Sequence, residues 1–188
     1  MLEEKTVYFE KTGPENTDKV LKISLQRAED LGIETIVVAS TTGSTAVKAV
    51  ELFGGIRVIA VSHSTGFSQP NTQQFTKQNR KVIDSKGGIV LTTTHTFGGI
   101  SRAMRNKFNT YVIGEIIANT LRIFGQGMKV ACEITLMAAD SGLVRTDEDI
   151  VAIGGSSRGA DTAVVLRPVN SQDFFDLRVN EILCKPRF

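Results

Sequence analysis

The chain has 188 residues, of which 41% are hydrophobic and 22% are charged, and its formal net charge at pH 7 is +2. This length and composition indicate a single globular domain over residues 1–188 rather than a disordered chain, which would have fewer apolar residues and a larger net charge. Because the net charge is small and the basic residues are scattered, the sequence gives no reason to expect a nucleic-acid partner.

The cysteines and the N-terminal residues indicate the cellular compartment. Cys132 and Cys184 are far apart and form no C-x-x-C motif, which is typical of a reducing compartment and indicates neither a metal site nor a redox role. Acidic residues follow Met1, and no apolar run is long enough for a signal-peptide core or a membrane span. We therefore expect a cytoplasmic protein without membrane contact.

The first half of the chain predicts strands and helices in alternation. Its apolar runs and helix-start signals define, in order, a strand at 6–9, a helix from Pro14 to Gly32, a strand at Thr35–Ala39, a helix at Ala46–Phe53, a strand at Arg57–Val61, a helix at Thr72–Ser85 and a strand at Ile89–Thr92. Nearly continuous apolar strands of this kind are buried on both faces. The alternation therefore predicts an α/β fold with a parallel sheet and right-handed crossovers.

The second half predicts a helical block followed by two more strands. The helical segments are Ile100–Lys107, Val112–Phe124 and Met128–Ala139. Strands are expected at Asp149–Ile153 and Thr162–Val169, and the short Gly/Ser loop between them predicts an antiparallel pair. The tail, residues 170–188, receives no assignment.

The most informative motif is the hydroxyl-rich loop after the strand at Thr35–Ala39. It reads Ser-Thr-Thr-Gly-Ser-Thr over residues 40–45 and runs directly into the next helix. The first N–H groups of a helix have no partner within it, and the helix dipole adds partial positive charge there, so this position suits an anion. Gly43 allows close backbone approach or a positive φ. The loop is therefore predicted to hold a phosphate; the alternative is a capped helix start without a ligand, because Ser and Thr are favoured caps.

Three further polar loops follow predicted strands, at Ser62–Phe67, Thr92–Gly99 and Gly154–Gly159. The carboxyl ends of parallel strands meet at one edge of a sheet, and open α/β sheets bind their ligands there. We therefore expect one binding site at that edge. Its candidate residues are Ser40, Thr41, Thr42, Gly43, Ser44, Thr45, His63, Ser64, Thr94, His95, Phe97, Gly98, Gly155, Ser156 and Arg158.

Several of these side chains have more than one interpretation. His63 and His95 are the two histidines of the chain. They are candidates for phosphate contact, acid–base catalysis or packing on a ligand ring; the alternative is that they are hydrogen-bonded loop residues without a function. Arg158 could clamp a phosphate or lie exposed in a turn. No third ligand at suitable spacing accompanies the histidines, so no metal site is predicted. Arg102, Arg105, Glu115 and Asp140 are expected on solvent-exposed helix faces; the alternative for Glu115 and Asp140 is that they line the crevice.

The loop at 40–45 lacks the G-x-x-x-x-G-K-[ST] and G-x-G-x-x-G patterns, so neither a nucleoside triphosphate nor a dinucleotide is indicated. It matches [ST]-x-T-G-x-T, and in this it resembles the phosphate loop of flavodoxin-like proteins, which hold the phosphate of flavin mononucleotide (FMN). In flavodoxins the loop follows the first strand and Trp or Tyr flanks the flavin. Here a helix precedes the loop and the chain has no Trp, so a flavodoxin-type electron carrier is not expected.

A second resemblance covers residues 14–169. The run Ile36–Ala46, the strand Arg57–Val61 and the closing segments Asp149–Gly155 and Thr162–Val169 are similar to the C-terminal domain of pyruvate kinase, and most similar to a stand-alone archaeal group of such domains that is associated with FMN. The resemblance implies a three-layer α/β/α sandwich with a mostly parallel five-stranded sheet and an antiparallel edge strand. It also implies a phosphate site at residues 41–45, where the pyruvate kinase domain holds a phosphate of its sugar-bisphosphate regulator.

The sequence thus predicts a protein that binds a phosphorylated small molecule, with FMN as the cofactor. Two other classes stay open: an enzyme that acts on a phosphorylated metabolite with His63 or His95 as acid–base, and a non-catalytic sensor of sugar phosphates, as the regulatory role of the related domain suggests. Pyruvate kinase activity is not implied, because the barrel that performs it has no counterpart in these residues. Self-association into a homo-oligomer is left open.

Overall fold

A single mixed sheet forms the centre of the computed structural model, which describes residue 1 and residues 3–187. In this part of the chain the sheet has seven strands in the order β1-β7-β6-β5-β2-β3-β4. Their bounds are β1 (Val7–Phe9), β2 (Thr35–Ala39), β3 (Arg57–Ser62), β4 (Ile89–Thr92), β5 (Ile150–Gly154), β6 (Thr162–Arg167) and β7 (Arg178–Pro186). Strands β5, β2, β3 and β4 are parallel neighbours, β6 is antiparallel to β5 and β7, and β1 is parallel to β7.

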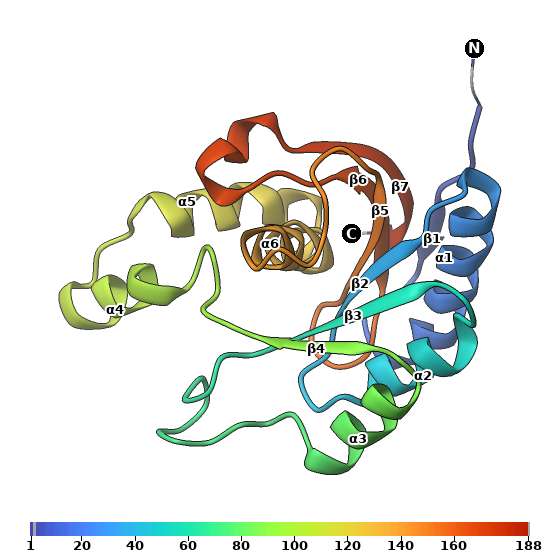
Figure 1. Cartoon of the computed structure of the whole chain (residues 1–188). Coiled ribbons are helices and arrows are strands. Elements are labelled where there is room, and N and C mark those ends of the chain that lie inside the picture. The colour runs from blue at the N-terminus through green and yellow to red at the C-terminus, as the bar shows by residue number, and fades with distance from the viewer. Residues whose placement is uncertain (2, 188) are drawn as a thin grey trace.

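Helices cover both faces of this sheet (Figure 1). The helices α1 (Thr17–Leu31), α2 (Ser44–Leu52) and α3 (Lys77–Ser85) pack on one face, and α6 (Gln126–Asp140) packs on the other. Each face has its own apolar core. Because successive strand residues point to opposite faces, Ile36 and Val38 of β2 enter the core under α1 and α2, whereas Val37 enters the core under α6.

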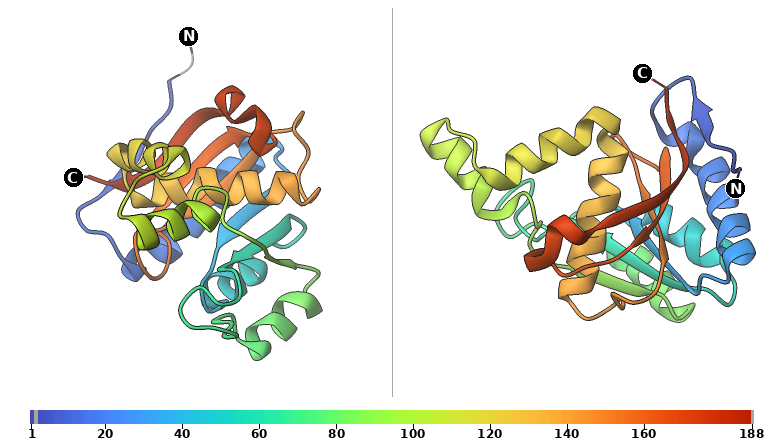
Figure 2. Two further views of the ribbon diagram at one scale, coloured as in Figure 1. Left: turned by 90° about the vertical axis from the view of Figure 1, so that its left-hand side faces the viewer. Right: turned by 90° about the horizontal axis from the view of Figure 1, so that it is seen from above.

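Two helices leave the layered body. The helices α4 (Gly99–Phe108) and α5 (Ile113–Leu121) project past α6, away from the sheet (Figures 1 and 2). Short 3-10 turns complete the chain: η1 (Pro14–Asn16), η2 (Arg122–Phe124) and η3 (Ser171–Asp176). Among the residues described, none of the helices combines the length and the apolar character needed to cross a membrane.

Local sequence signals account for the bounds of several elements. Gly32 ends α1 in the left-handed conformation, with φ of 64°. The strands β2 and β4 have their predicted bounds, and β5 and β6 form the predicted antiparallel pair. The helix α3 begins later than the helix predicted at Thr72–Ser85, because Thr76 caps it: its side chain accepts a hydrogen bond from the Asn79 N–H at 3.1 Å.

The α/β class is confirmed, but the predicted count of five strands is wrong. The unassigned tail forms β7 beside β6, and the N-terminal strand β1 pairs with β7. The strand predicted at Thr162–Val169 is therefore interior, not at the edge. The physical reason is that β6 is buried along Thr162–Leu166, and a buried strand needs a partner for the backbone groups on both of its sides.

Candidate functional site

The loop at 40–45 connects the carboxyl end of β2 to the first turn of α2. Gly43, the residue before α2, has a φ of 98°, which favours glycine. A Cβ at this position would lie 2.6 Å from Asn79 Cβ and 2.9 Å from the Phe75 ring. The loop therefore packs directly against the start of α3 and the residues before it, and glycine is the residue that fits there.

Hydrogen bonds fix the rest of this loop. The Thr76 N–H and Asn79 Nδ2 donate to the Thr42 carbonyl at 3.1 and 2.9 Å, and the Ala46 N–H donates to Ser40 Oγ at 3.3 Å. The exposed hydroxyls of Thr42 and Ser44 lie 3.2 Å apart. Gly43, which precedes α2, has no side chain to cap the helix, and Ser40 takes the N–H of Ala46, so the N–H groups of Ser44 and Thr45 are the ones that stay available to an anion.

A cavity of about 370 Å³ opens at this loop. Its walls are residues 39–42, 44 and 45, His63 with Gln74, the first turns of α6, and residues 155–159. Two helices, α2 and α6, therefore begin at the cavity, and the positive ends of both dipoles favour a negatively charged ligand. The volume is in the usual range for sites that bind small molecules.

The loop between β5 and β6 forms one rim of the cavity and is held by buried Asp161. The Ser156 N–H donates to Asp161 Oδ2 at 3.0 Å, and Thr162 Oγ1 donates to Asp161 Oδ1 at 2.8 Å. The Ala160 N–H donates to Thr17 Oγ1 at 3.0 Å, which ties the loop to α1. On this fixed backbone, the side chain of Arg158 is exposed and forms no ion pair with any described residue.

A second cavity of about 140 Å³ adjoins the first and shares Ser40, Thr41, His63 and Gln126 with it. Aromatic rings form part of its wall. The rings of His63 and Phe67 stack with their centroids 3.9 Å apart, and the His95 ring lies 5.0 Å from Phe67 and 5.3 Å from His63. The guanidinium of Arg102 lies 4.4 Å from the centroid of the Phe67 ring. The fold thus brings the two histidines together, although they follow different strands.

A buried ion pair on α6 forms another wall of the second cavity. Lys129 and Glu133 lie one helical turn apart, both almost fully buried, and Lys129 Nζ bonds to Glu133 Oε2. Glu133 Oε1 also accepts the Phe97 N–H at 3.0 Å. Burial lowers the pKa of Lys129. Burial is also the main cause that lowers the pKa of His95 to about 4, and the negative charge of Glu133 opposes this shift. His95 is therefore neutral near pH 7.

Most of the residues predicted from the sequence lie at these two cavities. Those that line the larger one are Ser40, Thr41, Thr42, Ser44, Thr45, His63, Gly155, Ser156 and Arg158, and His95 lines the smaller one. Gly43, Ser64 and Thr94 line neither cavity. Phe97 and Gly98 line a separate hollow of about 100 Å³, and the Phe97 ring is buried against Ala118 and Leu136. The loop that follows β4 thus contributes His95 rather than Phe97.

Residues that line the cavities and that the sequence analysis did not assign to the site include the polar and charged side chains of Gln74, Arg102, Arg122, Gln126, Lys129 and Glu133. The expected exposure of two helix residues is also wrong. Arg102 lines the smaller cavity, and Glu115 is buried and pairs with Arg105 at 3.2 Å. One signal in the sequence could have indicated this wall of the site, namely the pair Lys129 and Glu133. Two charged residues four positions apart inside an otherwise apolar helix seldom lie in a core without a function.

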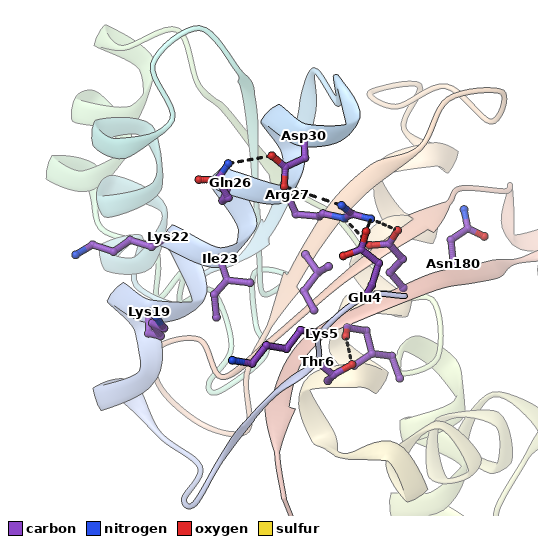
Figure 3. A pocket seen from close by; sticks show the side chains of 13 residues that line it. Glu4, Lys5, Thr6, Lys19, Lys22, Ile23, Gln26, Arg27, Asp30 and Asn180 are labelled. Carbon is purple, nitrogen blue, oxygen red and sulfur yellow. Dashed lines mark hydrogen bonds and ion pairs between the residues drawn. The ribbon is translucent and has the colours of Figure 1, made fainter. Parts of the chain in front are cut away.

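A larger hollow, of about 580 Å³, lies elsewhere, between the N-terminal segment, α1 and β7 (Figure 3). Its central charges neutralise one another: Arg27 bonds to Glu181 at 2.7 Å and to Glu4 at 2.9 Å. The bond to Glu181 is the main cause that raises the pKa of Arg27 above its usual range. Because these charged side chains already pair with one another, this hollow has a structural role. The candidate functional site is therefore the pair of cavities at the strand ends. No described cluster of three or more His, Cys, Asp or Glu side chains is placed to hold a metal ion.

The fold and the site define an α/β domain with a ligand crevice at the carboxyl ends of its parallel strands. Residues 18–166 match the family model described as the alpha/beta domain of pyruvate kinase. The match covers well over half of the chain, so this protein belongs to that family, and the resemblance to the C-terminal domain of pyruvate kinase is confirmed.

Solved structures similar to this chain include pyruvate kinases from Cryptosporidium parvum. One is 13% identical, with 81% of this chain and 23% of that chain covered and a TM-score of 0.44. A second is 14% identical, with coverages of 81% and 22% and a TM-score of 0.42. A third, in complex with ADP, is 13% identical, with coverages of 79% and 22% and a TM-score of 0.40. This chain thus spans less than a quarter of each of those chains.

Proposed function

We propose that this domain binds a small molecule through a phosphate monoester at loop 40–45, and that the ligand is FMN. One observation carries the proposal: the start of α2 and the exposed hydroxyls of Thr42 and Ser44 lie on a fixed backbone at a cavity of about 370 Å³. Helix N-terminal N–H groups and hydroxyl donors are the groups that bind phosphate in proteins. Arg158 adds a cation on the rim.

The residues around the two cavities suit FMN. The phosphate would be held by Thr42, Ser44 and the first N–H groups of α2, and the planar ring would extend toward the aromatic rings of the adjoining cavity. When bound, FMN supplies one- or two-electron redox chemistry. Phe67 stacks on His63 and lies under Arg102, so it is the side chain that must move before a ligand ring can stack on His63. The choice of FMN among phosphate monoesters rests on the [ST]-x-T-G-x-T pattern and the family resemblance.

The experiment is to record the absorption spectrum of the purified full chain, the mass of any small molecule that copurifies, and thermal unfolding with FMN. FMN at 100 times its Kd should add about 2.7 kcal/mol to the free energy of unfolding. Thr42→Val combined with Ser44→Ala should weaken FMN binding at least about tenfold, because hydrogen bonds to a charged group are lost. The matched control Thr146→Val, on an exposed turn, should bind normally. A colourless protein without a thermal shift contradicts the FMN proposal.

An enzymatic role is the second candidate, and the buried pair Lys129–Glu133 beside His95 favours it. A buried ion pair often stabilises a fold no more than apolar packing of similar volume would, so its presence at a cavity points to chemistry. Neutral His95, with His63 close to it, can exchange a proton with a metabolite whose phosphate is held at loop 40–45. The variant with His63→Asn and His95→Asn should then lose any turnover of a phosphorylated metabolite; unchanged turnover would exclude this role.

A further inference from the structure

The arm formed by α4, α5 and η2, residues 99–124, exposes much apolar surface. Ile100, Ile113 and Ile123 expose 83%, 76% and 73% of their surface. The exposed large apolar side chains of the arm are Ile100, Phe108, Tyr111, Ile113, Ile116, Ile123 and Phe124. Single exposed apolar residues are common in proteins, but a concentration of them on one short segment marks an interaction surface.

The exposed residues of α5 and η2 form a ridge. Ile113, Ile116 and Ile123 recur three and seven residues apart, which places them on one side of the helix. Glu115 and Ala118 are buried on the other side, toward the body of the domain. The inner side of α5 is thus packed, whereas its apolar outer side has no partner in the described chain (Figure 2).

The helix α4 lacks the packing that a helix of its length needs. It has ten residues, and none of them is buried. Arg105 pairs with Glu115 of α5, but the apolar residues Ile100 and Phe108 are exposed. A helix this short is marginal in water unless an apolar face packs against another element. The missing element has to come from outside the described chain.

We propose that the arm packs against the arm of a second copy of this chain in a two-fold symmetric dimer. At roughly 100 Å² each, the seven side chains present about 700 Å², close to the roughly 800 Å² that each partner buries in a standard interface. The apolar character of this surface also fits a homodimer, because homodimer interfaces are more apolar than the rest of a protein surface. A second copy brings the same apolar surface in equal amount, and two-fold symmetry closes the contact without growth into filaments.

The pairing would also fix one side of the candidate site. Arg102 of α4 and Arg122 of η2 line the smaller cavity, so both of these cations come from the arm. A paired arm would hold their backbone in place over the cavity. The dimer itself rests on the exposed surface alone and not on the identity of the ligand.

Sedimentation velocity of the full chain tests the proposal. The wild-type chain should sediment with twice its chain mass of 20.4 kDa at micromolar concentration. The variant with Ile113→Glu and Ile123→Glu should dissociate at least about 100-fold more readily, because two charges would be buried where apolar side chains pack. Leu31→Glu is the matched control, since Leu31 is an exposed leucine of α1 outside the arm, and it should stay dimeric. A monomeric wild type, or a dimer that survives the arm substitutions, overturns the proposal.

Cysteine cross-linking gives a second readout that does not depend on how well the charged variant folds. The native Cys132 and Cys184 are both buried, so a cysteine on the surface reacts selectively. Ile116→Cys, in the middle of the ridge, should give a covalent dimer with a short bifunctional thiol reagent. Leu31→Cys should give none. Cross-linking through position 31 and not through position 116 would place the interface elsewhere and refute the arm dimer.

Discussion

Replacing Gly43 by alanine tests whether loop 40–45 has the shape that the phosphate proposal requires. The residue has a φ of 98°, where an added Cβ costs about 1–2 kcal/mol. The new methyl group would also lie 2.6 Å from Asn79 Cβ and 2.9 Å from the Phe75 ring, and such overpacking costs about 1–3 kcal/mol. We therefore expect Gly43→Ala to lower the free energy of unfolding by about 2–5 kcal/mol. In a chain of this size the Tm should fall by roughly 4–20 °C.

Gly32→Ala is the matched control for this variant. Gly32 has a φ of 64°, but nothing lies within 4 Å of the position of an added Cβ. Its replacement should therefore cost only the backbone conformation, about 1 kcal/mol. Urea denaturation followed by circular dichroism measures both variants. If Gly43→Ala were no more destabilising than Gly32→Ala, Asn79 and Phe75 would not pack against the loop, and the reasoning would be refuted.

Two further predictions concern the smaller cavity. In the unfolded chain His95 takes up a proton near its ordinary pKa of about 6.5, whereas in the folded chain it does so only near a pKa of about 4. Between these two pH values the unfolded chain binds more protons, so His95 should make the free energy of unfolding fall as the pH drops from about 6.5 to about 4. His95→Asn should flatten the urea-denaturation profile between those pH values, and an unchanged profile would contradict the burial of His95. Lys129→Met leaves Glu133 buried without a counter-charge and should cost about 3–5 kcal/mol in urea denaturation. The double variant Lys129→Met with Glu133→Gln should regain part of the lost stability. If the single and the double variant lost the same free energy of unfolding, the pairing of Lys129 with Glu133 would be contradicted.

The sequence predicts much of the layered body, because the signals there are local. The continuous apolar run of β2 and the glycine that ends α1 set their bounds without help from distant residues. The convergence of loop 40–45 and His63 at one cavity then follows from the parallel order of β2 and β3, whose carboxyl ends lie side by side. The loop between β5 and β6 reaches the same edge, because β5 is parallel to β2.

The rest depends on contacts between segments that are far apart in sequence. Strand β7 is exposed over its first residues and pairs with β6 across register shifts, so its alternation of polar and apolar residues is weak. Its place is fixed by β1 and β6, which no pattern within the tail reveals. Arg102 and Arg122 reach the smaller cavity because the arm begins and ends beside it, and helical periodicity does not indicate such a course.

The most direct test of the central claim is a fluorescence titration of the full chain with FMN and with riboflavin, which has the same ring system but no phosphate. If loop 40–45 holds the phosphate, FMN should bind at least about 30-fold more tightly than riboflavin, a difference of about 2 kcal/mol. Thr42→Val with Ser44→Ala should remove most of that difference and leave riboflavin binding unchanged. Equal affinity for the two flavins would contradict a phosphate site at the loop, and the absence of binding by both would contradict FMN as the ligand.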